Sequence, residues 1–114
     1  MKNLFDAIPE QMPEELIEVI GGSGDTRIER IVSQGHCSEE RFWYDQVDDE
    51  FVLLLSGQAT VEFEDDVKSL KPGDYLTIAA HQKHLVKWTT SEEPAIWLAV
   101  YYGDREVSPG EKTA

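Results

Sequence analysis

The sequence contains little cysteine, little histidine and few positive charges. Its 114 residues include one Cys, three His and 10 Lys or Arg against 23 Asp or Glu, which gives a formal net charge of −13. Nucleic-acid binding needs clustered Lys and Arg that displace counterions, so we expect no nucleic acid and no anionic membrane surface as a partner. The acidic excess favours solubility and would attract metal cations or basic ligands.

A single cysteine, Cys37, excludes an intramolecular disulfide and a CxxC metal or redox pair. It indicates a reducing compartment. The sequence also lacks an apolar run long enough for a signal peptide, or for a membrane helix of roughly 20 residues. These absences predict a cytoplasmic protein, and the length suits a single domain over residues 1–114.

Short apolar segments separated by turn residues fill the chain. Turn signals recur about every 8 to 12 residues, as in β-sandwiches and barrels, and no long helix is expected beyond one turn near residues 12–16. Gly21 to Gly24 and Lys71 to Asp74 are predicted turns, and Ser56-Gly57-Gln58 is predicted to close a hairpin. We expect strands at residues 26–32, 50–55, 59–63, 75–79, 85–88 and 95–102.

Residues 51–55 are apolar on both faces of their predicted strand. A strand sustains this pattern when one face fills an interior and the other packs on a neighbouring sheet. The fold class is therefore predicted as all-β, with a barrel or jelly roll that dimerises through apolar outer faces. The polar tail at residues 105–114 is expected to fray.

Two spaced motifs resemble those of the cupin family. Its first motif has two His around one residue, then Glu, then six residues and Gly, and Glu50 and Gly57 match the second half. In its second motif, Gly73 and His84 match the first Gly and the His, while Ala79 and His81 stand in the Pro and second Gly positions. The resemblance covers about residues 26–102 and implies a double-stranded β-helix (a jelly-roll or cupin barrel), with a homodimer as the expected assembly.

A typical cupin holds a divalent metal through three His and one Glu, and this chain departs from that set. The two His positions are occupied by Tyr44 and Gln46 if three residues separate the second one from Glu50, or by Trp43 and Asp45 if four do. The first spacing keeps Tyr44, Gln46 and Glu50 on one strand face, which favours it. The resemblance therefore implies a reduced metal site, for Mn, Fe, Ni, Cu or Zn, whose candidate ligands are Glu50, His84, Gln46 and Asp45.

The candidate ligand pocket comprises Tyr44, Val86 and Trp88, because Val86 and Trp88 share the strand parity of His84 and are expected to point inward. The alternative is structural: Glu50 is a buried carboxylate hydrogen-bonded to Tyr44, Gln46 or His84, and the aromatic residues fill the core. His81 is expected at the surface. His36 and Cys37 lie in a polar loop, and no third group that would orient them as a nucleophile pair is apparent.

Three functions remain open from the sequence. The first is a metal-dependent enzyme of the oxygenase or isomerase class that acts on a small organic molecule, with Glu50 and His84 as ligands and Tyr44 or Gln46 positioning the substrate. The second is a non-catalytic cupin that binds a small ligand in the same cavity. The third is a structural or partner-binding barrel whose interior polar residues satisfy one another.

Overall fold

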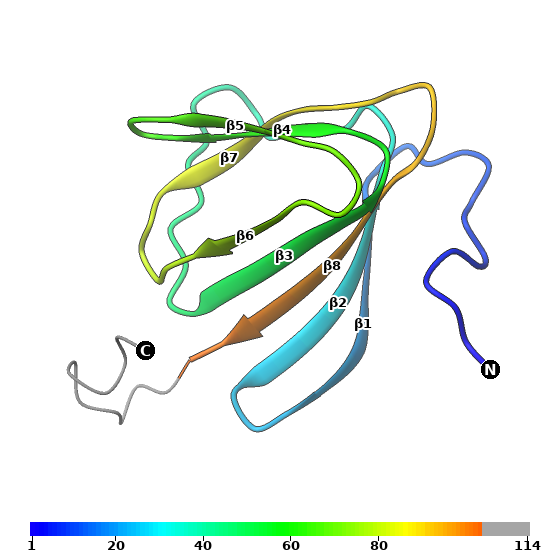
Figure 1. Cartoon of the computed structure of the whole chain (residues 1–114), viewed down its shortest axis with the longest axis horizontal. Coiled ribbons are helices and arrows are strands. Elements are labelled where there is room, and N and C mark those ends of the chain that lie inside the picture. Colours follow the sequence, from blue (N-terminus) through cyan, green and yellow to red (C-terminus); the bar gives the residue numbers. More distant parts are fainter. Residues whose placement is uncertain (104–114) are drawn as a thin grey trace.

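Two antiparallel β-sheets face each other in the computed structural model, which describes residues 1–103 (Figure 1). One sheet has the strand order β1-β2-β8-β3-β6 and the other has the order β5-β4-β7. The described residues include no helix. The strands are β1 (Leu16–Ser23), β2 (Thr26–Ser33), β3 (Asp49–Ser56), β4 (Ala59–Phe63), β5 (Val67–Leu70), β6 (Tyr75–Ile78), β7 (His84–Thr89) and β8 (Ala95–Tyr102).

The segment Ser56-Gly57-Gln58 does not close a hairpin, so this prediction was wrong. Strand β3 pairs with β6 and β8, whereas β4 pairs with β5 and β7, and the segment carries the chain from one sheet to the other. Gly57 does have the predicted positive φ, at 79°. A Cβ at Gly57 would lie 2.7 Å from the Cα of Ala95, the first residue of β8. Glycine is therefore required both by the backbone angle and by the close approach of β8.

Other turns differ in detail from the sequence pattern. Strand β1 runs through Gly21 and Gly22 to pair Ser23 with Thr26, which confines the first turn to Gly24 and Asp25. The predicted turn at residues 71–74 is confirmed, since the Asp74 amide donates to the Lys71 carbonyl at 2.9 Å. Strand β5 was not predicted, because only Leu70 of its four residues is buried and alternation is absent.

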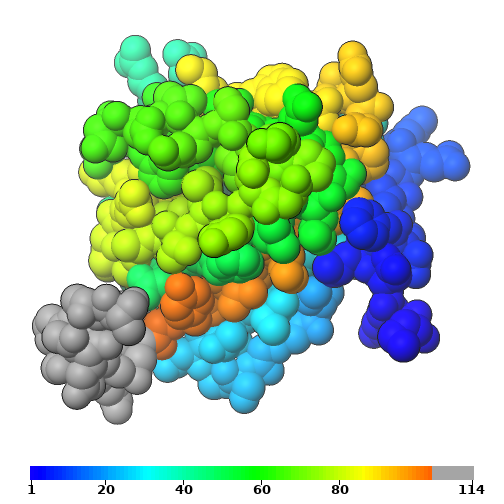
Figure 2. Space-filling model, viewed as in Figure 1, coloured from blue at the N-terminus to red at the C-terminus, as the bar shows by residue number. Residues whose placement is uncertain are grey.

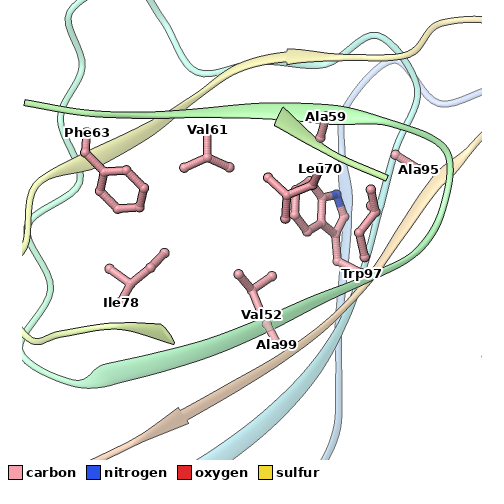
Figure 3. Packing of buried hydrophobic residues seen from close by; sticks show 10 residues of the cluster. Val52, Ala59, Val61, Phe63, Leu70, Ile78, Ala95, Trp97 and Ala99 are labelled. Carbon is pink, nitrogen blue, oxygen red and sulfur yellow. The ribbon is translucent and has the colours of Figure 1, made fainter. Parts of the chain in front are cut away.

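The core lies between the inner faces of the two sheets. Alternate residues of β3 and β4 are buried, and Figure 3 shows Val61 and Phe63 of β4 facing Val52 of β3 and Ile78 of β6 across the interior. The ten buried residues of this cluster are Val52, Leu54, Ala59, Val61, Phe63, Leu70, Ile78, Ala95, Trp97 and Ala99. The alternation follows from the strand period of two, which sends every second side chain inward.

The N-terminal segment is held against the five-stranded sheet by Arg30. The guanidinium of this buried residue bonds the Glu18 carboxylate, and its NH1 group donates to the carbonyls of Leu4 (3.1 Å) and Asp6 (2.6 Å). Figure 2 shows the first residues, in dark blue, along one edge of the molecule. Arg30 thus acts as a polar anchor for a segment without secondary structure.

Candidate functional site

The interior polar site is built on a row of residues that crosses four strands. Arg27 on β2 pairs in register with Tyr101 on β8, Tyr101 with Glu50 on β3, and Glu50 with Ile78 on β6. Residues opposite each other in antiparallel strands place their side chains on the same face. The register therefore sets the Tyr101 and Glu50 side chains next to each other on the inner face.

His84 faces this row from the other sheet. It opens β7, pairs with Phe63 of β4 and forms an isolated bridge with Tyr44, whose ring stacks on the imidazole at 5.8 Å between centroids. The Nε2 atom of His84 lies 3.6 Å from Oε1 of Glu50. Both side chains are buried, so the carboxylate and imidazole expected to share one interior do lie together.

The hydrogen bond of Nδ1 defines the tautomer of His84. Nδ1 lies 3.0 Å from the carbonyl oxygen of Gln82, and since a carbonyl only accepts, Nδ1 carries the proton. A neutral imidazole of this tautomer has its lone pair on Nε2, which is the atom closest to Glu50. The neutral ring thus presents an acceptor to the interior.

Glu50 is a carboxyl group with one oxygen left without a partner. Burial raises its pKa from 4.5 to about 7, an effect opposed by a hydrogen bond from the Tyr101 hydroxyl and reinforced by the nearby charge of Glu29. Burial also raises the pKa of Tyr101, which stays a protonated donor. Within residues 1–103, nothing hydrogen-bonds Oε1 of Glu50 or the buried Oε1 of Gln46.

The outer end of the row is charged and tied to the surface. The half-exposed Arg27 donates from Nε to the carboxylate of Glu29 at 2.8 Å, and its guanidinium lies 4.3 Å from the centroid of the Tyr101 ring. Glu29 is itself buried. The cation stacked on its ring holds Tyr101 in place from the side away from Glu50.

These polar groups line a cavity of about 140 Å³ between the sheets. Most of its wall is apolar, and it contains no Lys or Arg among the described residues. Ile17 and Tyr44 are exposed and also line it, which places its mouth at their end, where Glu15 accepts a 2.5 Å hydrogen bond from Ser33. The lining residues are Glu15, Ile17, Ile31, Tyr44, Gln46, Glu50, Val52, Val61, Ile78, His84, Val86, Trp97 and Tyr101.

Three of the candidate residues, Asp45, His36 and Cys37, lie outside the cavity lining. Asp45 is exposed and pairs with Nδ1 of His81 at 2.7 Å, away from the cavity lining, while Gln46 and Tyr44 do line it, as the three-residue spacing implies. His36 bonds the amide of Gln34 and the carbonyl of Met12, which makes it a loop support. Cys37 is exposed.

Trp88 does not point inward, and the parity argument for it was wrong. Strand β4 pairs Val61 with Val86 and the preceding Thr60 with Trp88, so Lys87 is an extra residue on β7. Such a bulge reverses which side chains face the interior from that point on. Val86 therefore lines the cavity, whereas Trp88 is 47% exposed.

Sequence reasoning did not place Tyr101, Trp97, Ile31, Ile17 or Glu15 in the site. The pairing of β8 with β3 and β2 brings in Tyr101 and Trp97, and this register is not encoded in any local spacing. The signal available was the alternation of β8 itself, which sets Trp97, Ala99 and Tyr101 on one face.

Comparison with known proteins gives the family. The family model described as the cupin domain matches residues 29–101. The chain belongs to the cupin family. Among solved structures, this cupin is similar to a Ralstonia eutropha JMP134 protein provisionally named a mannose-6-phosphate isomerase, with 40% identity, a TM-score of 0.88, and coverage of 91% of this chain and 98% of that one.

More distant structures share the cupin fold. A cupin superfamily protein of Desulfitobacterium hafniense DCB-2 is 21% identical, with a TM-score of 0.70 over 85% of this chain and 84% of that one. A Streptococcus pyogenes protein of unknown function is 16% identical, with a TM-score of 0.73 over 92% and 88%. At these identities the likeness shows the fold alone. No curated protein matches the chain.

The residues of the site do not fit a tightly held transition metal of the usual cupin kind. Glu50 and His84 lie together and Gln46 lines the same cavity, so one carboxylate, one imidazole and one carboxamide remain. Across residues 1–103, no group of three or more His, Cys, Asp or Glu is arranged to hold a metal ion. A neutral amide oxygen in place of two imidazoles weakens affinity for Fe, Ni, Cu and Zn.

The described part of the chain contains no helix that is long and apolar enough to cross a membrane.

Proposed function

We propose that this cupin binds a small organic molecule in the cavity between its sheets, with Glu50, His84 and Gln46 as the polar end that fixes its orientation. The observation that carries the proposal is an apolar cavity that ends in buried polar atoms, two of which have no hydrogen-bond partner within residues 1–103. A mostly apolar wall with a few convergent polar groups is the usual form of a small-molecule site. Unpaired buried polar atoms are costly, and a ligand would satisfy them.

The size of the cavity limits the ligand to about one ring or a short branched chain. A cavity of about 150 Å³ holds benzene in a well-studied engineered case, and this one measures about 140 Å³. A larger molecule would have to extend past Ile17 and Tyr44 into solvent.

Ligand-observed NMR with a fragment library tests this binding site. Val86→Phe fills the cavity wall, and we expect it to abolish the signals of fragments that bind the wild type. Val67→Phe, a matched substitution at an exposed position on β5 outside the cavity, is expected to leave them unchanged. Fragments that bind all three proteins equally would show that the cavity is not the site.

A second candidate is proton transfer of the isomerase class, and the pairing of Glu50 with His84 favours it. A carboxyl group whose pKa is about 7 can give or take a proton near neutral pH, and the Nε2 atom of His84 lies 3.6 Å away. The relative that is 40% identical carries the provisional name of an isomerase. Deuterium incorporation from D₂O into dihydroxyacetone, followed by NMR, tests this activity, and Glu50→Gln and His84→Asn should each abolish it.

Sugar phosphates are poorer substrates on electrostatic grounds. The cavity lining contains Glu15 and Glu50 and no Lys or Arg, so a phosphate group would meet negative charge without a counter-ion. We expect no conversion of mannose 6-phosphate to fructose 6-phosphate. Conversion of mannose 6-phosphate that is lost in Glu50→Gln would contradict this expectation and would show that the chain has the isomerase activity.

A homodimer formed through β1 is part of the same proposal. Strand β1 is an edge of the larger sheet, and its Ile17, Val19 and Ile20 are exposed. A long apolar edge is commonly covered by another chain, and a second copy would also close the cavity mouth at Ile17. Light scattering should give a dimer mass for the wild type and a monomer mass for Val19→Glu.

A cytoplasmic location is likewise a proposal that fractionation of cells would test.

A further inference from the structure

We propose that the ligand of this cavity is a small amine, recognised as a hydrogen-bond donor by three acceptor atoms. The inference rests on the proposed small-molecule site and narrows its chemistry. The atoms are Oε1 of Glu50, Oε1 of Gln46 and Nε2 of His84, and all three residues line the one cavity.

The three atoms share one hydrogen-bonding character. The oxygen atoms of an ionised Glu50 and of the Gln46 carboxamide accept hydrogen bonds, and the hydrogen bond from Nδ1 to the Gln82 carbonyl leaves the lone pair of a neutral imidazole on Nε2. The 3.6 Å separation of Nε2 from Oε1 of Glu50 is longer than a hydrogen bond, so these two atoms do not satisfy each other. A donor placed among them would satisfy atoms that residues 1–103 leave without partners.

The electrostatics favour a donor that carries positive charge. Glu15 at the mouth and Glu50 inside are the acidic residues of the lining, no cationic side chain of the described chain faces them in the cavity, and the whole chain carries a net charge of −13. An ammonium group provides up to three donors and the opposite charge. A carboxylate or phosphate ligand would add acceptors and negative charge to a site that already has both.

The apolar lining of the cavity favours an amine that carries an apolar group. Ile31, Val52, Val61, Ile78 and Trp97 line the same cavity, and a methylene or ring surface gains by being buried against them. Together with the volume of about 140 Å³, this indicates one amine on one ring or on a short branched chain. A polyamine would leave additional ammonium groups against apolar walls.

Three probes of matched size separate the possibilities. Benzylamine, benzyl alcohol and benzoate share a ring and differ in charge and in donor count. Calorimetric titration at pH 8, above the pKa of about 7 of Glu50, with EDTA present measures each. We expect benzylamine to bind about tenfold more tightly than benzyl alcohol, because hydrogen bonds to charged groups are the stronger ones. Benzoate is expected to bind most weakly.

Variants assign the effect to the acceptor cluster. Glu50→Gln replaces a charged acceptor with an amide of the same shape, and benzylamine affinity should fall about tenfold while benzyl alcohol affinity changes much less. Glu62→Gln, on β4 and outside the cavity, removes the same charge and should alter neither affinity.

The outcomes that overturn the inference are distinct from failure of the site itself. Tighter binding of benzoate than of benzylamine, sensitive to Val86→Phe, would refute the amine class and keep the small-molecule cavity. Absence of binding by all three probes and by the fragment library would overturn both. Binding of one equivalent of Mn, Fe, Ni, Cu or Zn that is lost in Glu50→Gln and His84→Ala, and that benzylamine does not displace, would assign the acceptors to a metal instead.

Discussion

Arg30 and Glu50 are equally buried charged residues of one sheet, and they differ in how their polar atoms are paired. Each is 6% exposed. Arg30 bonds the Glu18 carboxylate and two backbone carbonyls of the N-terminal segment, whereas Oε1 of Glu50 has no hydrogen-bond partner within residues 1–103. A buried charge that is fully paired supports structure, and one left partly unpaired lowers stability unless something else binds it. The comparison therefore separates a structural anchor from a candidate site in the same sheet.

Replacing Glu50 by Gln should give the larger effect, and it should depend on pH. The pKa of Glu50 is raised from 4.5 to about 7, so the folded protein binds the proton more tightly than the unfolded chain does. The stability from this group is fully present below pH 4.5, falls as pH rises from about 4.5 to about 7, and is lost above that. The loss corresponds to about 3 kcal/mol.

Urea unfolding of the wild type and of Glu50→Gln at several pH values measures this loss. At pH 8 the variant should be more stable than the wild type by about 3 kcal/mol, and near pH 4.5 the two should nearly coincide, because Gln is never charged. Glu62→Gln serves as the control and should follow the wild-type profile. A difference between wild type and Glu50→Gln that stays constant with pH would mean that the carboxyl is not destabilised by burial.

Replacing Arg30 by Met tests the other half of the comparison. The methionine keeps much of the side-chain volume but leaves the carbonyls of Leu4 and Asp6 without their donor, so we expect a loss of about 2 kcal/mol at every pH between 5 and 8. Hydrogen exchange should also accelerate at the amides of Phe5 and Asp6, which bond Asn3 in the folded segment.

Arg41→Met, at an exposed arginine, is the matched control and should change stability by less than about 0.5 kcal/mol. Unchanged exchange at Phe5 and Asp6 in Arg30→Met would show that other contacts hold the N-terminal segment.

The sequence was sufficient for the strands other than β1 and β5 and for the meeting of Glu50 with His84. It failed where the backbone departs from a period of two. Spacing from the turns at Gly57 and Gly73 locates both residues, and alternation sets Glu50, Val52 and Leu54 on the inner face. The extra residue Lys87 could not be read from composition, and it turned Trp88 outward.

Pairing between distant strands is the second kind of information that local patterns lack. The turn at Gly57 has the residues of a hairpin, yet the chain crosses between sheets there because β8 and β6 occupy the two edges of β3. The same pairing brings Tyr101 beside Glu50. A donor to the central carboxyl thus comes from a strand about 50 residues away, which single-sequence periodicity does not specify.

Replacing Tyr101 by Phe should give the smallest effect and would sharpen the comparison further. The Tyr101 hydroxyl lowers the pKa of Glu50 through its hydrogen bond to the carboxyl group. Removing the hydroxyl should therefore raise the pKa of Glu50 above 7. Stability at pH 8 should fall by about 1 kcal/mol, with a smaller loss at pH 5, where Glu50 is protonated in both proteins. NMR titration of the Glu50 side-chain carboxyl carbon measures the pKa directly. Tyr102→Phe, the neighbouring residue that does not line the cavity, should leave it unchanged. A fall in the Glu50 pKa in Tyr101→Phe would contradict this prediction. It would mean that water or another donor reaches the carboxylate once the hydroxyl is gone, so that burial does not keep Glu50 from other hydrogen-bond donors.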